Sequence, residues 1–193
     1  GFGTTGELIG GGLKEKNFLG KGINLNTSLE LTPESVKGNF VYAKPNFNNT
    51  DNTLFTSLKS STDDFLSNSG YKTSELGFSL GTQFEQFQNI FLSPEIDFLL
   101  EDLETSNKAS DVLKKQEGSY TDLYFNYTIN QDLRDRKFRT QDGYQTFFSQ
   151  EVPLISDNSE FSNAFEFSKF KKLSTKSDTC LLYTSDAADD GYR

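Results

Sequence analysis

Apolar and polar side chains alternate through Ile23-Asn24-Leu25-Asn26-Thr27-Ser28-Leu29-Glu30-Leu31. Because a β-strand has a side-chain period of two, this segment predicts a strand with one apolar face and one polar face. Similar segments, separated by turn-like clusters, recur almost from end to end of the chain. Strands of about 9–11 residues are long enough to cross a bilayer at a tilt. The repeated pattern therefore predicts part of a transmembrane β-barrel, in which lipid-facing and lumen-facing residues alternate.

The alternation predicts an all-β fold, an antiparallel meander of about nine to ten strands including a short stub at Gly1–Gly3. We expect the other strands at Leu8–Lys14, Gly22–Thr32, Val36–Lys44, Asn52–Thr62, Tyr71–Phe84, Ile90–Leu103, Tyr120–Gln131, Gly143–Val152 and Phe161–Leu173. The least regular of them is Asn52–Thr62, because Phe55 is out of phase. The long polar stretch Glu104–Gly118 predicts a surface loop, with one helical turn near Val112–Lys115.

Composition narrows the class of protein. Hydrophobic residues make up 34% of the 193 residues and the mean hydropathy is −0.60, and no apolar run is long enough for a helical membrane span. The chain has no Met and starts inside a glycine-rich stretch, so we expect it to be processed or a fragment. A net charge of −9 argues against nucleic acid as a partner. The absence of His removes the commonest general base and metal ligand, and we expect no metal and no cofactor.

The last residues differ from the rest. The segment from Cys180 to Asp190 shows no alternation, and it resembles translated sequencing-adapter read-through. We therefore expect a partial barrel over residues 1–173 and a non-native or disordered tail over residues 174–193.

Motifs that would indicate other chemistry are weak. Gly1-Phe2-Gly3-Thr4-Thr5-Gly6 matches GxGxxG, but the glycines that follow cannot sustain the helix that a phosphate site requires. Arg134-Asp135 lacks the His and Asn of a kinase catalytic loop. Carboxylates are plentiful, yet nothing singles out a glycosidase-type pair, and a solvated acid is the simpler interpretation.

Four motifs are distinctive: Gly1-Phe2-Gly3-Thr4, Asn17-Phe18-Leu19-Gly20-Lys21-Gly22, Lys44-Pro45-Asn46-Phe47, and Leu133-Arg134-Asp135-Arg136-Lys137-Phe138 leading to Asp142-Gly143-Tyr144. In this order and spacing they resemble the BamA family of outer-membrane protein assembly factors, over about Gly1 to Leu173. One departure is Thr140, where the family usually has Pro in this last turn; we expect it to loosen the turn without moving it.

The resemblance implies a sixteen-stranded barrel in the bacterial outer membrane, preceded by periplasmic POTRA domains. This chain would run from the end of strand one to about strand ten, without the closing strands and the inward-folded Arg-Gly-Phe loop. Asn17–Gly22, Asn46–Asp51, Gln86–Asn89 and Asp132–Gly143 would be periplasmic turns, and Thr4–Glu7, Asp63–Gly70 and Glu104–Gly118 would face outward.

For function, the resemblance implies that the protein is not an enzyme and that nascent barrels insert through a weak seam between the first and last strands. Gly1, Phe2 and Gly3 would lie on the gate strand and pair with a substrate strand, although these glycines could equally serve only a tight strand and turn. Arg134, Asp135, Phe138, Asp142 and Gly143 would form the structural turn. The implied partners are unfolded outer-membrane proteins, outer-membrane lipids and, through the POTRA domains, periplasmic assembly lipoproteins.

Alternatives stay open at this point. They are a TamA-like or two-partner-secretion translocation pore, a passive porin-like channel with Glu104–Gly118 as its constriction loop, and a soluble β-sandwich. A sandwich would need shorter strands and apolar faces packed on each other.

Overall fold

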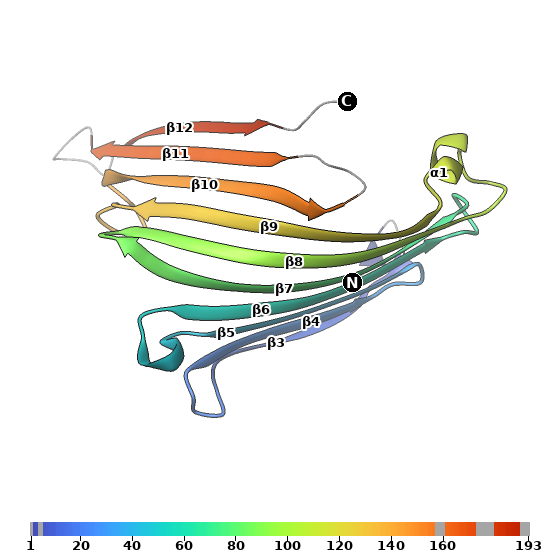
Figure 1. Ribbon diagram of the computed structural model, residues 1–193, viewed down its shortest axis with the longest axis horizontal. Coiled ribbons are helices and arrows are strands. Elements are labelled where there is room, and N and C mark those ends of the chain that lie inside the picture. Colours follow the sequence, from blue (N-terminus) through green and yellow to red (C-terminus); the bar gives the residue numbers. More distant parts are fainter. Residues whose placement is uncertain (1, 4–5, 157–160, 173–179, 190–193) are drawn as a thin grey trace.

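A computed structural model describes residues 2–3, 6–156, 161–172 and 180–189, and its dominant feature is one curved antiparallel sheet (Figure 1). Ten strands form it in strict sequence order, each paired with the next. They are β3 (Ile9–Phe18), β4 (Ile23–Leu31), β5 (Ser35–Lys44), β6 (Thr53–Phe65), β7 (Tyr71–Phe87), β8 (Ile90–Thr105), β9 (Gly118–Asp132), β10 (Asp142–Ile155), β11 (Ser162–Lys172) and β12 (Cys180–Asp189). The predicted all-β meander is confirmed, and the sheet is open, ending on β3 and β12.

A small hairpin precedes the sheet. β1 (Phe2–Gly3) pairs with β2 (Gly6–Glu7), and β3 begins two residues later. Residues 4–5 of the predicted turn and Gly1 of the predicted stub lie outside the described residues.

The two faces of the sheet differ in polarity as the alternation predicts. In register, Leu58, Phe78 and Phe98 form one apolar row, and Ser57, Ser79 and Asp97 form the polar row behind it. Within the described chain, no second layer covers the apolar face. Its exposed members include Leu29, Leu31, Val36, Phe40, Leu58, Leu76, Phe78, Leu80, Ile96, Phe98, Leu100, Ile129 and Phe165. No helix in the described ranges is both long enough and apolar enough to traverse a bilayer.

The connections fall at two ends of the sheet. One end, on the left in Figure 1, holds the turns at residues 19–22, 45–52, 88–89 and 133–141, and we call it the turn end. Left-handed backbone at Leu19, Asn46 and Asn89 makes three of these turns tight. The opposite end holds the connections at residues 32–34, 66–70 and 106–117, and we call it the loop end.

The connection between β8 and β9 docks on its neighbour at the loop end. It contains α1 (Asp111–Lys115), capped by the Ser110 side chain, so the predicted helical turn is confirmed. The Gly70 carbonyl accepts a hydrogen bond from the Ser106 amide (2.7 Å), and Lys108 Nζ donates to the Ser67 carbonyl (2.7 Å). These contacts hold the segment beside the β6–β7 connection.

Two features differ from the sequence expectation. β12 forms within the range that we expect to lie outside the fold, and it pairs with β11 from Lys172↔Cys180 to Asn163↔Asp189. The origin of this stretch stays a prediction, and residues 174–179 and 190–193 lie outside the described residues. Phe55, which is out of phase in sequence, pairs with Gly81 on the polar face. A Cβ on Gly81 would lie 2.4 Å from Cζ of the Phe55 ring, so the ring fills the space that Gly81 leaves.

Candidate functional site

The first candidate is the edge of the sheet at β3. β1 and β2 form a separate two-stranded sheet, through the pairs Phe2↔Glu7 and Gly3↔Gly6, and β2 leads into β3. From Ile9 to Phe18 the outer side of β3 has no neighbouring strand in the described chain. The backbone donors and acceptors on this side are those with which a preceding strand of the barrel would pair.

Glycines leave this edge with few side chains. Gly10, Gly11 and Gly12 stand side by side in β3. A Cβ at Gly11 would meet nothing within 4 Å, whereas one at Gly12 would lie 2.9 Å from the Thr27 carbonyl oxygen of β4. Gly12 therefore permits close packing on β4, and Gly11 leaves an open position on the opposite face. Cross-strand side-chain pairs stabilise a sheet, and these three glycines contribute none to the pairing of β3 with β4.

The second candidate is the turn between β9 and β10, where the structure brings together the predicted Arg134, Asp135, Asp142 and Gly143. Asp135 organises it: its Oδ1 accepts hydrogen bonds from the amides of Gln141 (2.9 Å) and Asp142 (3.2 Å). The donation from Gln141, followed by that from Asp142, holds the pKa of Asp135 below its usual range. The Asp135 amide donates to the Asp142 carbonyl (3.0 Å), which closes the turn from both sides.

Gly143 allows the chain to re-enter the sheet. Its φ is 101°, a conformation that L side chains rarely adopt. A Cβ at Gly143 would lie 2.1 Å from the Leu133 carbonyl oxygen and 2.8 Å from Arg134 Cα. No other residue fits here without opening the turn.

Asp132 and Thr140 also contribute to the turn, through contacts that were not predicted. Asp132 receives a bidentate pair from Arg134, with Nε and Nη2 each 2.7 Å from a carboxylate oxygen. Thr140, which we expected to loosen the turn, donates from its hydroxyl to the Arg136 carbonyl at 2.7 Å. In the sequence, the signal for the Asp132–Arg134 pair is an acidic residue two positions before an arginine.

Phe138 does not join the other predicted turn residues. Its side chain is 78% exposed, and the Arg139 guanidinium lies 5.5 Å from the ring centroid. The two candidates also lie apart, because β1 and β2 lead into β3 at one edge of the sheet whereas the turn joins β9 and β10. They do not form one site.

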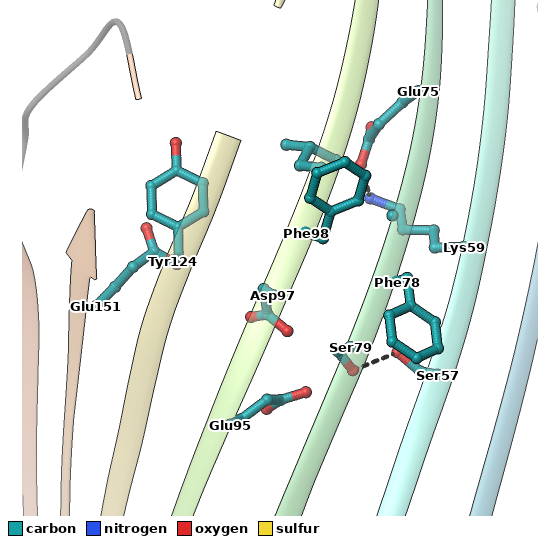
Figure 2. A pocket seen from close by; sticks show the side chains of 12 residues that line it. Ser57, Lys59, Glu75, Phe78, Ser79, Glu95, Asp97, Phe98, Tyr124 and Glu151 are labelled. Carbon is teal, nitrogen blue, oxygen red and sulfur yellow. Dashed lines mark hydrogen bonds and ion pairs between the residues drawn. The ribbon is translucent and has the colours of Figure 1, made fainter. Parts of the chain in front are cut away.

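The polar face carries a hollow of about 490 Å³ across β6 to β10. Figure 2 shows its side chains: Lys59 pairs with Glu75 (2.8 Å), and the Ser57 and Ser79 hydroxyls are hydrogen-bonded (2.8 Å). Glu95, Asp97 and Glu151 line it further along. In the part of the chain that the structure describes, no group of three or more potential ligands is arranged to hold a metal ion. The hollow is therefore a feature of the polar face of the sheet.

Comparisons with known proteins agree with this geometry. A model of the Omp85 superfamily domain matches residues 17–188. The structure is similar to the crystal structure of BamA from Haemophilus ducreyi lacking POTRA domains 1–3, with 18% sequence identity and a TM-score of 0.69. The match covers 95% of this chain and 39% of that chain, so this chain spans well under half of that protein. No curated protein matches significantly. At this identity the structural likeness establishes the fold.

Proposed function

The chain belongs to the Omp85 superfamily and is part of a bacterial outer-membrane β-barrel, and from this premise we propose that it folds and inserts nascent outer-membrane proteins. The observation that supports the proposal best is the short β1–β2 hairpin that leads into the edge strand β3. A substrate strand could pair with the strand that contains Phe2 and Gly3, because unpaired backbone is costly in lipid and favours strand addition.

The register of the β1–β2 pairs supports a specific position for this strand. The pairs Phe2↔Glu7 and Gly3↔Gly6 run antiparallel, so a strand continuing in the N-terminal direction from Phe2 would lie along Ile9–Phe18. The glycines of β3 offer that strand few side chains to pack against. A substrate strand would pair with the other side of this continued strand, which is the side that faces the last strand of the barrel.

The proposed partners follow from this role. They are unfolded outer-membrane proteins at the seam, outer-membrane lipids around the apolar face, and periplasmic lipoproteins bound through POTRA domains. The activity is strand templating without covalent chemistry. The turn end would face the periplasm, and Arg134, Asp135, Asp142 and Gly143 would keep β9 and β10 in register there.

The alternatives lead to different outcomes. A TamA-like or two-partner-secretion pore would pass a polypeptide across the membrane and would not fold barrels. A porin-like channel would need residues 104–118 folded into the lumen, whereas α1 and its loop dock beside the β6–β7 connection at the loop end (Figure 1). That docking favours assembly or secretion over a passive channel.

The test uses the whole protein that contains this chain, reconstituted in liposomes. Phe2→Cys on the proposed gate strand is compared with Leu100→Cys, which is exposed on the apolar face of β8. A urea-unfolded outer-membrane barrel with a Cys in its last strand is then added. We expect faster barrel folding than in empty liposomes, and a disulfide cross-link at position 2 and not at position 100. Absence of both effects would overturn the proposal, and passage of a soluble polypeptide into the lumen would assign translocation instead.

A further inference from the structure

Basic side chains gather at the turn end, on the strands that carry the apolar face. The outward residues of β11 run Phe165, Phe167, Lys169 and Lys171, so this strand changes from aromatic to basic as it reaches the turn end. The neighbouring turn adds Lys137 and Arg139 beside the exposed Phe138. This clustering stands out in a chain whose net charge is −9.

Register places the lysines on the same face as the apolar rows. Phe148 pairs with Phe165 and Tyr144 pairs with Lys169, and positions two apart on a strand share a face. The rings of Tyr144 and Phe167 lie 6.1 Å apart, centroid to centroid, between the apolar rows and the lysines. Aromatic residues followed by cations are typical of the boundary between hydrocarbon and headgroups.

The distances along the strand suit that boundary. Each step of two residues advances roughly 7 Å along a strand, which a tilt near 40° reduces to roughly 5 Å along the membrane normal. Lys169 and Lys171 therefore lie roughly 5–10 Å beyond Phe167, at the depth of lipid phosphates.

Charge accounting leaves these cations available. Asp132 is engaged by Arg134, and Asp135 by backbone amides and Arg136. Asp142 accepts from the Gly143 amide at 2.9 Å. Within the described ranges, Lys137, Arg139, Lys169 and Lys171 make no ion pair.

We propose that Lys137, Arg139, Lys169 and Lys171, with Phe138 at the tip of the turn, form a surface that binds the headgroups of anionic phospholipids in the periplasmic leaflet of the outer membrane. The four cations can pair with lipid phosphates, whereas the carboxylates of the turn cannot. It rests on the proposed orientation, with the turn end toward the periplasm. Cations near a bilayer surface each gain about fivefold in affinity from anionic lipid.

The test places a fluorophore at the tip. This chain contains no Trp, so Phe138→Trp in the whole protein gives a signal above the parent background. The protein is reconstituted in bilayers that contain brominated phosphatidylglycerol or brominated phosphatidylcholine at equal mole fraction. We expect stronger quenching by phosphatidylglycerol. The preference should weaken in high salt, and by about fivefold for each cation removed in Lys137→Gln/Lys169→Gln/Lys171→Gln.

The matched control removes three cations at the loop end, Lys72→Gln/Lys114→Gln/Lys115→Gln, and should keep the preference. Equal quenching by the two lipids would overturn the proposal, as would a preference for lipopolysaccharide over phosphatidylglycerol. The cross-link at position 2 is measured separately, so failure of the lipid surface is distinguishable from failure of the assembly function.

Discussion

Replacing Gly143 by Ala should destabilise the barrel strongly. The backbone conformation, with φ 101°, costs a side chain about 1–3 kcal/mol. The added Cβ would also lie 2.1 Å from the Leu133 carbonyl oxygen, which no rotamer change can relieve.

Relief of that contact requires the turn to open. Opening would stretch two hydrogen bonds, from the Leu133 amide to the Tyr144 carbonyl (2.9 Å) and from the Asp135 amide to the Asp142 carbonyl (3.0 Å). Each contributes about 1 kcal/mol, so the total loss should be about 3–5 kcal/mol.

Gly20→Ala is the matched control. Gly20 also has positive φ, at 70°, but a Cβ there would meet nothing within 4 Å. Its loss should be about 1–2 kcal/mol, the cost of the left-handed backbone alone. The assay is urea unfolding of the whole protein in detergent micelles, followed by the heat-modifiable mobility of the folded barrel. Equal losses for the two variants would refute the claim that contact with Leu133 makes Gly143 indispensable.

Three further outcomes follow from the same structure. Gly81→Ala should lower the free energy of unfolding by about 1–3 kcal/mol because the Phe55 ring occupies the space of the added Cβ. The loss should be smaller in a Phe55→Ala background, which a double-mutant cycle measures; additive effects would contradict the prediction. Asp135→Asn should lower the unfolding midpoint at pH 7 and lose its effect in acid. A depressed pKa gives stability that is present above the unfolded-state pKa and is lost as pH falls through the folded-state pKa. A constant deficit in the midpoint between pH 7 and pH 2 would show that the charge of Asp135 is irrelevant. Leu80→Lys on the apolar face should reduce the stability of the barrel in a bilayer by about 2–4 kcal/mol, and Ser93→Lys on the polar face by much less. Both losses are measured by folding into liposomes. Similar losses would mean that the apolar face does not contact lipid.

Period-two alternation was enough to predict the meander, because strand faces in a single-layer sheet need no tertiary information. The predicted strand Gly22–Thr32 exceeds β4, Ile23–Leu31, by one residue at each end. Strand ends were less predictable: β6 runs on to Phe65 through Asp63 and Asp64, since backbone pairing with β7 continues past the apolar part of the strand.

Pairing between distant residues could not be predicted. Phe55 appeared as an irregularity because its partner, Gly81, lies on the next strand and only the register reveals the pair. The turn motif predicted Arg134, Asp135 and Gly143 as a group, yet the roles of Asp132 and Thr140 depend on how the chain folds back between them. β12 was missed because its sequence does not alternate, and pairing with β11 is a backbone property.

The strictly sequential order of the strands bears on how such a wall is made. Every ladder from β3 to β12 joins segments that are neighbours along the chain, so each new hairpin can zip onto the last as the polypeptide arrives. Closing the cylinder is then the one step that must unite remote parts of the chain, and it carries most of the entropic cost of ring formation. In the proposed assembly factor, a final seam that closes weakly would keep this last step of folding reversible in the mature protein.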